Sequence, residues 1–337
     1  MTFFQYLEGI NNTKKISKTD VWKHQILTNK PLSSFGVLEQ IGYRLTSIIG
    51  VDKKIIKENV VVFAGDHGIA EMNLSKFKQS QTKKVVSLLM HGKTPLNKIL
   101  GQSFDNLICV DIGINGDVLE EGLIIRKVAN GTNNIYQKPA MDKKSMFAAL
   151  NVGIEIAKSC FDSGTDIVAL GEVGIGNTIP SSVAAALLCD LSSDIVTGNG
   201  TGVTGEVLQQ KKDVIKNLIL KYSNCKNDPY SILMNIGGYE ICGDVGFILG
   251  CAYYKIPVIL DGFITGVAAL IASKMHRDVV DYLFASHLSK EPAHFYVLNE
   301  LQLNPILNLG MRYGLATGSA MTLNLHKIAY KLTNNVI

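Results

Sequence analysis

The sequence is poor in charge, and the charges that it has are not clustered. Only 18% of its residues are charged, and the formal net charge is +4. The lysines are scattered along the chain, so no basic patch of the kind that binds a nucleic-acid backbone is present. We therefore expect no nucleic-acid partner. The high apolar content, 47%, excludes a disordered chain and favours a globular one with a large core.

Long uninterrupted hydrophobic runs are also absent. The most apolar region, Val245–Met275, is broken by Lys255, Pro257 and Asp261. Such a region is typical of buried strands and helices and excludes a membrane span there. The first residues lack a basic segment followed by an apolar stretch, so we expect no signal peptide and a cytoplasmic protein.

The six cysteines show no C-x-x-C spacing and mostly lie in apolar runs. This pattern excludes a disulfide framework and favours free thiols in a reducing compartment. Metal ligands are scarce as well. Asp66 and His67 are adjacent, but a zinc site needs three or four ligands, so we expect no metal.

Short apolar runs that end in polar, glycine-containing turns alternate with segments of helical periodicity. This alternation predicts an α/β fold, a Rossmann-like doubly wound parallel sheet. The carboxyl ends of such strands meet at one edge and form one pocket. Asp66, His67 and Asp261 follow strands directly and are therefore candidates for that pocket, although a histidine satisfied by hydrogen bonds is an equal alternative for His67. The expected strands lie at 60–64, 107–112, 166–170 and 256–260, with a further strand-to-glycine junction at 235–240.

The most informative turn is Gly171–Thr178, between an expected strand and a helix that starts near Ser181. A strand, a glycine-rich turn and a helix start point backbone N–H groups at an anion. Gly174 and Gly176 allow close approach of a ligand, and Asn177 and Thr178 add donors. Glu172 adds a carboxylate, which suits a ligand that is anionic at one end and hydroxyl-bearing or electron-poor at the other. A tight turn that merely needs glycine remains the alternative.

A second glycine-rich turn, 197–202, precedes an expected helix that carries Lys211. This lysine is either a phosphate ligand or an exposed helix residue. The spacing of the two turns matches neither the dinucleotide fingerprint nor a P-loop.

Taken in order, these and other motifs resemble the nicotinate-nucleotide:dimethylbenzimidazole phosphoribosyltransferase family. The resemblance runs from about residue 24 to residue 330. Its motifs are Lys30-Pro, Gly36, Leu38-Glu39, Ala64-Gly-Asp-His-Gly68, Gly131-Thr, Pro139-Ala-Met141, Gly171-Glu-x-Gly-Ile-Gly-Asn-Thr178, Gly237-Gly-Tyr-Glu240, Asp261-Gly-Phe-Ile264, Ser286-His, Ser289, Glu291-Pro, Met311-Arg, Gly314 and Thr317-Gly318.

The resemblance implies transfer of ribose phosphate from nicotinate mononucleotide to an aromatic lower-ligand base of cobamides, the vitamin B12-type cofactors, with release of nicotinate. It also implies a large α/β domain, residues 40–300, and a small helical domain made of residues 1–39 and 301–337. Family members work as dimers, and the reaction requires no cofactor.

Site residues follow from the resemblance one by one. Gly174, Gly176, Asn177, Thr178 and Lys211 would hold the ribose phosphate. Glu172 would lie near the ribose and its cationic centre. Ser75, Gln79 and Leu315 would line the pocket of the acceptor base.

One position departs from the family pattern. The family's general-base glutamate is replaced by Leu315. Leucine cannot take the proton that dimethylbenzimidazole loses, so that reaction is expected to be slow. Two interpretations stay open. Either the acceptor is different, such as phenol or p-cresol, or the chain is a supporting or nucleotide-binding subunit that pairs with an active paralogue. The dimer is accordingly a homodimer or a heterodimer.

Overall fold

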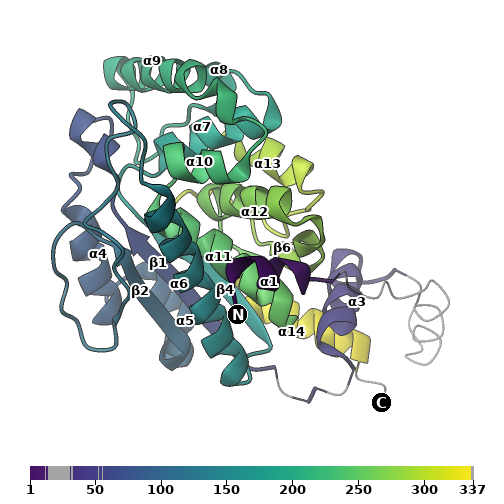
Figure 1. The fold of residues 1–337 in the computed structure, drawn as a ribbon. Helices are drawn as coiled ribbons and strands as arrows, with labels where there is room; N and C mark the ends of the chain where they lie inside the picture. The colour runs from purple at the N-terminus through teal and green to yellow at the C-terminus, as the bar shows by residue number, and fades with distance from the viewer. Residues whose placement is uncertain (12, 14–30, 32, 52, 55, 335–337) are drawn as a thin grey trace.

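A computed structural model describes residues 1–337 except 12, 14–30, 32, 52, 55 and 335–337, so the motif residue Lys30 lies outside the described residues. Six strands in the described part form one parallel sheet in the order β3-β2-β1-β4-β5-β6 (Figure 1). The strands are β1 (Glu58–Gly65), β2 (Leu107–Gly113), β3 (Ile124–Ile125), β4 (Ile167–Val173), β5 (Val258–Leu260) and β6 (Leu283–Ala285).

This strand order confirms the predicted doubly wound, Rossmann-like sheet. The chain builds outward from β1 through β2 to β3, then returns to place β4 on the other side of β1. The order reverses between β1 and β4, and ligands of open α/β sheets bind at the carboxyl ends of the strands next to such a reversal.

Both faces of the sheet are buried, because alternate side chains of each strand enter different cores. Val61 and Phe63 of β1 belong to one core, and Val60 and Val62 belong to the other. Both faces must therefore be covered by helices, which explains the continuous apolar runs of these strands.

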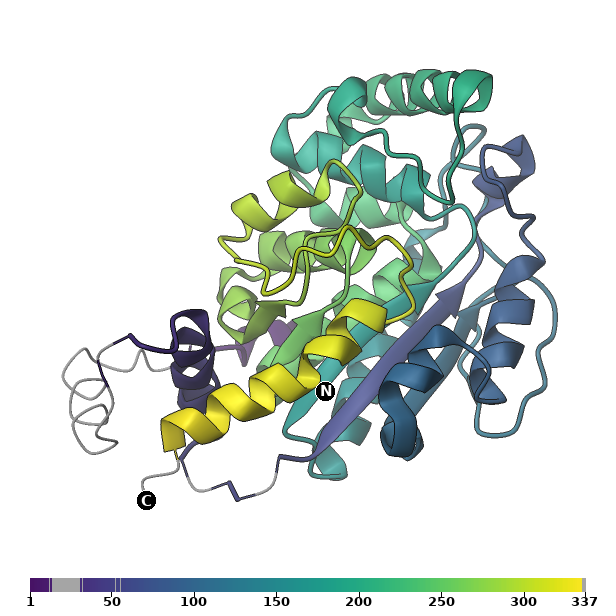
Figure 2. The same cartoon turned by 180° about the vertical axis from the view of Figure 1, so that it is seen from behind.

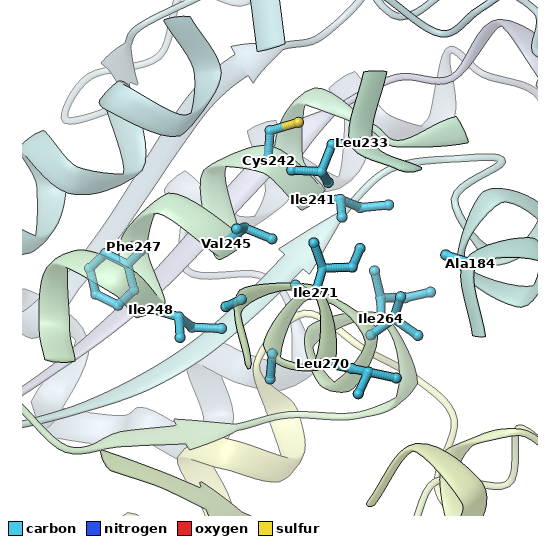
Figure 3. Packing of buried hydrophobic residues seen from close by; sticks show 14 of the residues in the cluster. Ala184, Leu233, Ile241, Cys242, Val245, Phe247, Ile248, Ile264, Leu270 and Ile271 are labelled. Carbon is cyan, nitrogen blue, oxygen red and sulfur yellow. The ribbon is translucent and has the colours of Figure 1, made fainter. Parts of the chain in front are cut away.

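The larger core is covered by α6 (Lys143–Asp162), α11 (Tyr239–Tyr254) and α12 (Phe263–Met275). Gly246 lets α11 approach α6 closely, since a Cβ there would lie 1.9 Å from the backbone oxygen of Leu150. Figure 3 shows Ile241, Val245 and Ile248 of α11 beside Ile264, Leu270 and Ile271 of α12. The short helix α1 (Phe3–Glu8) packs on α11.

The opposite face is covered by α14 (Thr317–Asn334), which crosses the sheet in Figure 2, with α3 (Val37–Ile49) packed against it. Helices α4 (Gln81–Met90) and α5 (Pro95–Leu100) complete this layer. The two ends of the chain therefore meet through α3 and α14, and the domain boundary expected at residue 40 falls within α3.

The remaining helices lie toward the carboxyl edge of the sheet, with α8 and α9 stacked beyond α7 (Figure 1). They are α7 (Thr178–Cys189), α8 (Ser193–Val196), α9 (Gly205–Lys221), α10 (Pro229–Ile236) and α13 (His294–Glu300). Short 3-10 helices lie at Gly68–Met72, Gly101–Asn106, Ser223–Cys225 and Arg277–Tyr282. None of the described helices combines the length and apolarity that crossing a membrane requires.

One predicted element is wrong. The residues before Gly237 were expected to form a strand, but they form α10. Asp228 caps this helix by accepting from the amide of Tyr230, and Pro229 occupies its first position. Both are helix-start signals that outweigh the apolar run that follows. The short strands β3 and β6 were not expected.

Candidate active site

A cavity of about 560 Å³ lies at the carboxyl end of β4, beside the point where the strand order reverses. The Gly174–Thr178 turn forms part of its wall, and loops after β5 and β6 form the opposite wall. The turn needs its glycines. A Cβ on Gly174 would lie 2.2 Å from the backbone oxygen of Gly65, and Gly176 has a φ of +103°. These constraints alone explain the glycines, but the cavity in front of the turn adds space for a ligand.

Gly174, Gly176, Asn177 and Thr178 all line this cavity, at the start of the 12-residue helix α7. A glycine-rich turn before a helix is typical of anion sites. The amides of Asn177 and Ile179 are already used inside this turn, where they donate to the backbone oxygens of Gly174 and Gly176. The side chain of Asn177 also contacts Glu172, since its Nδ2 donates to Oε2 of Glu172 at 2.5 Å.

Lys211 lies in the same cavity and is only 1% exposed, which excludes the exposed helix lysine. Its Nζ donates to the backbone oxygen of Gly198 at 2.8 Å and to Oγ1 of Thr178 at 3.3 Å. An ammonium group has three N–H donors, so one remains for a ligand. Burial lowers the pKa of Lys211, and the charge of Glu291 opposes that shift.

Glu172 is buried at the end of β4 and lines the cavity beside the anion-binding turn. Burial raises the pKa of its carboxyl group to about 8, and the nearby charges of Glu240 and Asp261 add to the rise, whereas the hydrogen bond from Asn177 lowers it. A positive charge in the cavity would favour the ionised form. Glu172 is therefore placed to respond to a cationic ligand.

Asp66 and His67 lie outside the set of residues that line the cavity. Asp66 accepts from Oγ1 of Thr82 at 2.6 Å and from the amide of Asn115 at 2.9 Å. Nε2 of His67 lies 2.5 Å from Oε1 of Glu240. These buried contacts join β1, α4 and α11, so the two residues support the loops around the cavity.

Asp261 lines the cavity, but it also caps a helix. Its Oδ1 accepts from the amides of Gly318 at 2.6 Å and Ser319 at 3.2 Å, at the start of α14. Burial raises the pKa of Asp261 to about 6, and these backbone donors oppose the rise. Asp261 thus holds the start of α14 against the cavity.

The end of the cavity near α4 is largely apolar. Ser75 lines it, and its Oγ lies 3.1 Å from Oγ1 of Thr201. Gln79 is not among the lining residues, because its Nε2 donates to the backbone oxygen of His67 and its Oε1 accepts from Asn115. The other lining residues at this end are Ile69, Leu74, Phe77, Gln81 and Val85.

Leu315 also lines the cavity and is buried. Its φ is +57°, and that of the next residue, Ala316, is +55°. Two successive non-glycine residues in the left-handed region are strained, which is a common feature of functional sites. The position that carries a glutamate in the resembled family thus faces the cavity and offers it only an aliphatic side chain.

Several lining residues were not assigned to the pocket from sequence. His287, Ser289 and Glu291 belong to a motif of the resemblance but had no role attached to them. Gly200 and Thr201 come from the second glycine-rich turn. Membership in these motifs was the sequence signal that could have assigned these residues to the pocket. The apolar lining residues carried no signal, because only the fold brings them to the cavity.

The cavity combines the ammonium group of Lys211 and the Gly174–Thr178 turn with an apolar end. It also contains the carboxyl group of Glu172. It can hold an anion and place an electron-poor centre beside Glu172, next to a flat apolar group. Among the described residues, no three His, Cys, Asp or Glu side chains come together as a metal site.

Comparison with known proteins identifies the chain's relatives. A family model described as Phosphoribosyltransferase matches residues 10–337. A nicotinate-nucleotide–dimethylbenzimidazole phosphoribosyltransferase of Clostridium acetobutylicum is 35% identical over 330 residues, 98% of this chain and 94% of the relative. One from Geobacter sulfurreducens is 39% identical over 298 residues, 88% and 85% of the two chains. The crystal structure of CobT from Thermus thermophilus matches with a TM-score of 0.87 at 31% identity, covering 93% of this chain and 94% of that one. The chain therefore belongs to the nicotinate-nucleotide–dimethylbenzimidazole phosphoribosyltransferase family.

Proposed function

We propose that this protein transfers the phosphoribosyl group of nicotinate mononucleotide to an aromatic base of a cobamide lower ligand and releases nicotinate. The observation that carries this proposal is the cavity in which Glu172 and Lys211 accompany the Gly174–Thr178 turn. The relatives that cover nearly the whole chain bear the name of this activity.

In the proposed reaction, the bond between ribose C1′ and the pyridinium nitrogen breaks, and its electron pair stays on the nitrogen. Nicotinate thus leaves without being protonated. A new bond forms between C1′ and the acceptor, which loses a proton. Because the sugar becomes cationic in the transition state, the main tasks are to hold the phosphate, to stabilise positive charge and to align the acceptor.

Three groups fit these tasks. The remaining N–H of Lys211 and the amides of the turn bind the phosphate. Glu172 ionises when the positively charged pyridinium donor arrives and then stabilises the cationic sugar. The apolar part of the lining, which includes Leu315 and the residues near α4, receives the ring of the acceptor.

We further propose a phenolic acceptor, phenol or p-cresol. Leu315 supports this choice, because an aliphatic side chain suits a plain aromatic ring and cannot serve a benzimidazole that has a second nitrogen proton to lose. Mass spectrometry of mixtures of the protein, nicotinate mononucleotide and either base tests this. A ribosylated phenol phosphate is expected, and a ribosylated benzimidazole phosphate alone would contradict the phenolic choice.

The absence of a carboxylate at position 315 also favours a second candidate function. In it, the chain is a supporting subunit of a heterodimer with an active paralogue, whereas an active chain would form a homodimer. A mixture of this chain and the paralogue, with Glu172→Gln introduced only into this chain, distinguishes the two candidate functions. Lost turnover assigns the working site to this chain, and unchanged turnover assigns it to the partner.

A further inference from the structure

The cavity has no glutamate at position 315, so another group must take the proton of the acceptor. Among the described lining residues, four side chains have an acidic or imidazole group that could do so. They are Glu172, Asp261, His287 and Glu291.

Each of the three carboxylates already accepts hydrogen bonds through one oxygen. Oε2 of Glu172 accepts from Asn177, and Oδ1 of Asp261 accepts two amides of α14. Oε1 of Glu291 accepts from the amide of Gly200 at 3.0 Å. Its Oε2 has no hydrogen-bond partner, but it is buried against Gly198, on which a Cβ would lie only 2.0 Å from it. Glu172 is in addition protonated below about pH 8 in the empty cavity, because burial raises its pKa to that value.

The hydrogen bonds around His287 define its tautomer. Oγ of Ser286 donates to the backbone oxygen of Asp261 at 2.7 Å and lies 3.1 Å from Nδ1 of His287. A hydroxyl group has one proton, so Ser286 must accept from His287. Nδ1 therefore carries the ring proton, and Nε2 carries a lone pair that no described residue engages.

The ring lies against the turn that carries Leu315. A Cβ on Gly318, three residues after Leu315, would lie 2.0 Å from Nδ1 of His287. On the other side, a Cβ on Gly262 would lie 3.8 Å from Nε2. Gly318 thus leaves room for the ring, whereas Gly262 is at ordinary contact distance from it and itself lines the cavity.

The surroundings keep the ring neutral. Burial lowers the pKa of His287, and the titratable groups packed around it are Asp261 after β5 and His294 of α13. Burial lowers the pKa of His294 to about 3, so that ring adds no positive charge at neutral pH. His287 is therefore unprotonated at neutral pH and able to accept a proton.

We propose that Nε2 of His287 accepts the proton lost by the aromatic acceptor, in place of the glutamate that is missing at position 315. This inference rests on the proposed transferase function. The O–H bond of the phenolic acceptor breaks as its oxygen bonds to C1′, and the electron pair of the C1′–pyridinium bond leaves with nicotinate. The imidazolium then returns its proton to water.

The test compares acceptors of different acidity in the native chain, in His287→Gln and in His287→Asn. The two acceptors are phenol and its nitro-substituted analogue, which ionises more readily. His91→Gln is the control, because His91 is an exposed residue that does not line the cavity. Affinity for nicotinate mononucleotide and thermal unfolding check that each variant folds.

General-base catalysis contributes about 100-fold or more to a rate. Folded His287 variants are therefore expected to lose about 100-fold in kcat with the parent base, with an unchanged KM for the nucleotide. They should lose far less with the nitro analogue, which is already ionised at the assay pH. Equal loss with both acceptors, or no loss, overturns the role of His287 alone. If the native chain releases no nicotinate with any acceptor, the transferase function itself is overturned.

Discussion

The amide of Leu315 donates a hydrogen bond of 3.2 Å to the backbone oxygen of Glu172. This contact ties the turn before α14 to the end of β4. It brings the position of the missing glutamate next to the carboxylate that faces the ribose site in our proposal. A Cβ on Gly171 would lie 2.2 Å from the amide nitrogen of Ala316, so the same turn packs tightly on the strand. The turn that carries Leu315 is therefore held directly against the end of β4 and Glu172.

Leu315→Glu restores a carboxylate to this position. If the missing base is the only defect toward dimethylbenzimidazole, turnover with that base should rise by about 100-fold, the lower range of general-base effects. The measurement is nicotinate release. Leu309→Glu is the control, because Leu309 is exposed and absent from the cavity lining. No gain in a folded Leu315→Glu variant would mean that the pocket has diverged at further positions.

Glu172→Gln should abolish turnover if this chain is catalytic. The amide keeps the shape of the side chain but cannot ionise to stabilise the cationic sugar, and we expect a loss of about 100- to 1000-fold in kcat. Glu206→Gln, on the exposed first turn of α9, is the matched control. Unchanged turnover in Glu172→Gln would remove this residue from the mechanism.

The raised pKa of Glu172 also predicts a pH-dependent stability. The folded chain holds this proton up to about pH 8, whereas the reference value is 4.5. The contribution of Glu172 to stability is thus fully present below pH 4.5 and is lost as the pH rises through 8. Relative to Glu172→Gln, the free energy of unfolding of the native chain should fall by up to about 1.4 kcal/mol per pH unit in that window. Urea unfolding of both proteins at pH 5 and pH 8 measures this. A difference between the two proteins that stays constant with pH would contradict it.

Lys211→Met should weaken binding of the nucleotide. Methionine fills similar space, but the charged donor to the phosphate is lost, and such a hydrogen bond contributes about 1.5–3 kcal/mol. We expect the Kd of nicotinate mononucleotide to rise by roughly 10- to 100-fold in calorimetry. The neighbouring Lys212 pairs with Asp194 at the surface, so Lys212→Met is the control. Equal effects of both variants would exclude a specific phosphate contact by Lys211.

Much of the fold could be predicted because its signals are local. The apolar runs of β1, β2 and β4 and the glycine turns after them are contiguous in sequence. The segment before Gly237 was predicted wrongly because its signal is also local. Its apolar run fits a strand or a buried helix equally well, and only the cap by Asp228 decides for the helix.

The site was predictable only in part. Gly174, Gly176, Thr178, Lys211 and Glu172 lie together in the cavity, as expected from their motifs. The placement of Gln79 and His67 behind the cavity wall depends on their partners Asn115 and Glu240, which are distant in sequence. A short motif cannot state which of its polar residues face a ligand and which support the wall.

The most direct test of the central claim is nicotinate release from nicotinate mononucleotide by the purified chain alone, with phenol and with dimethylbenzimidazole in parallel. The account predicts release with phenol, much slower release with dimethylbenzimidazole, and none above background with either base in Glu172→Gln. Absence of release with both bases from a folded native chain that binds the nucleotide would contradict it.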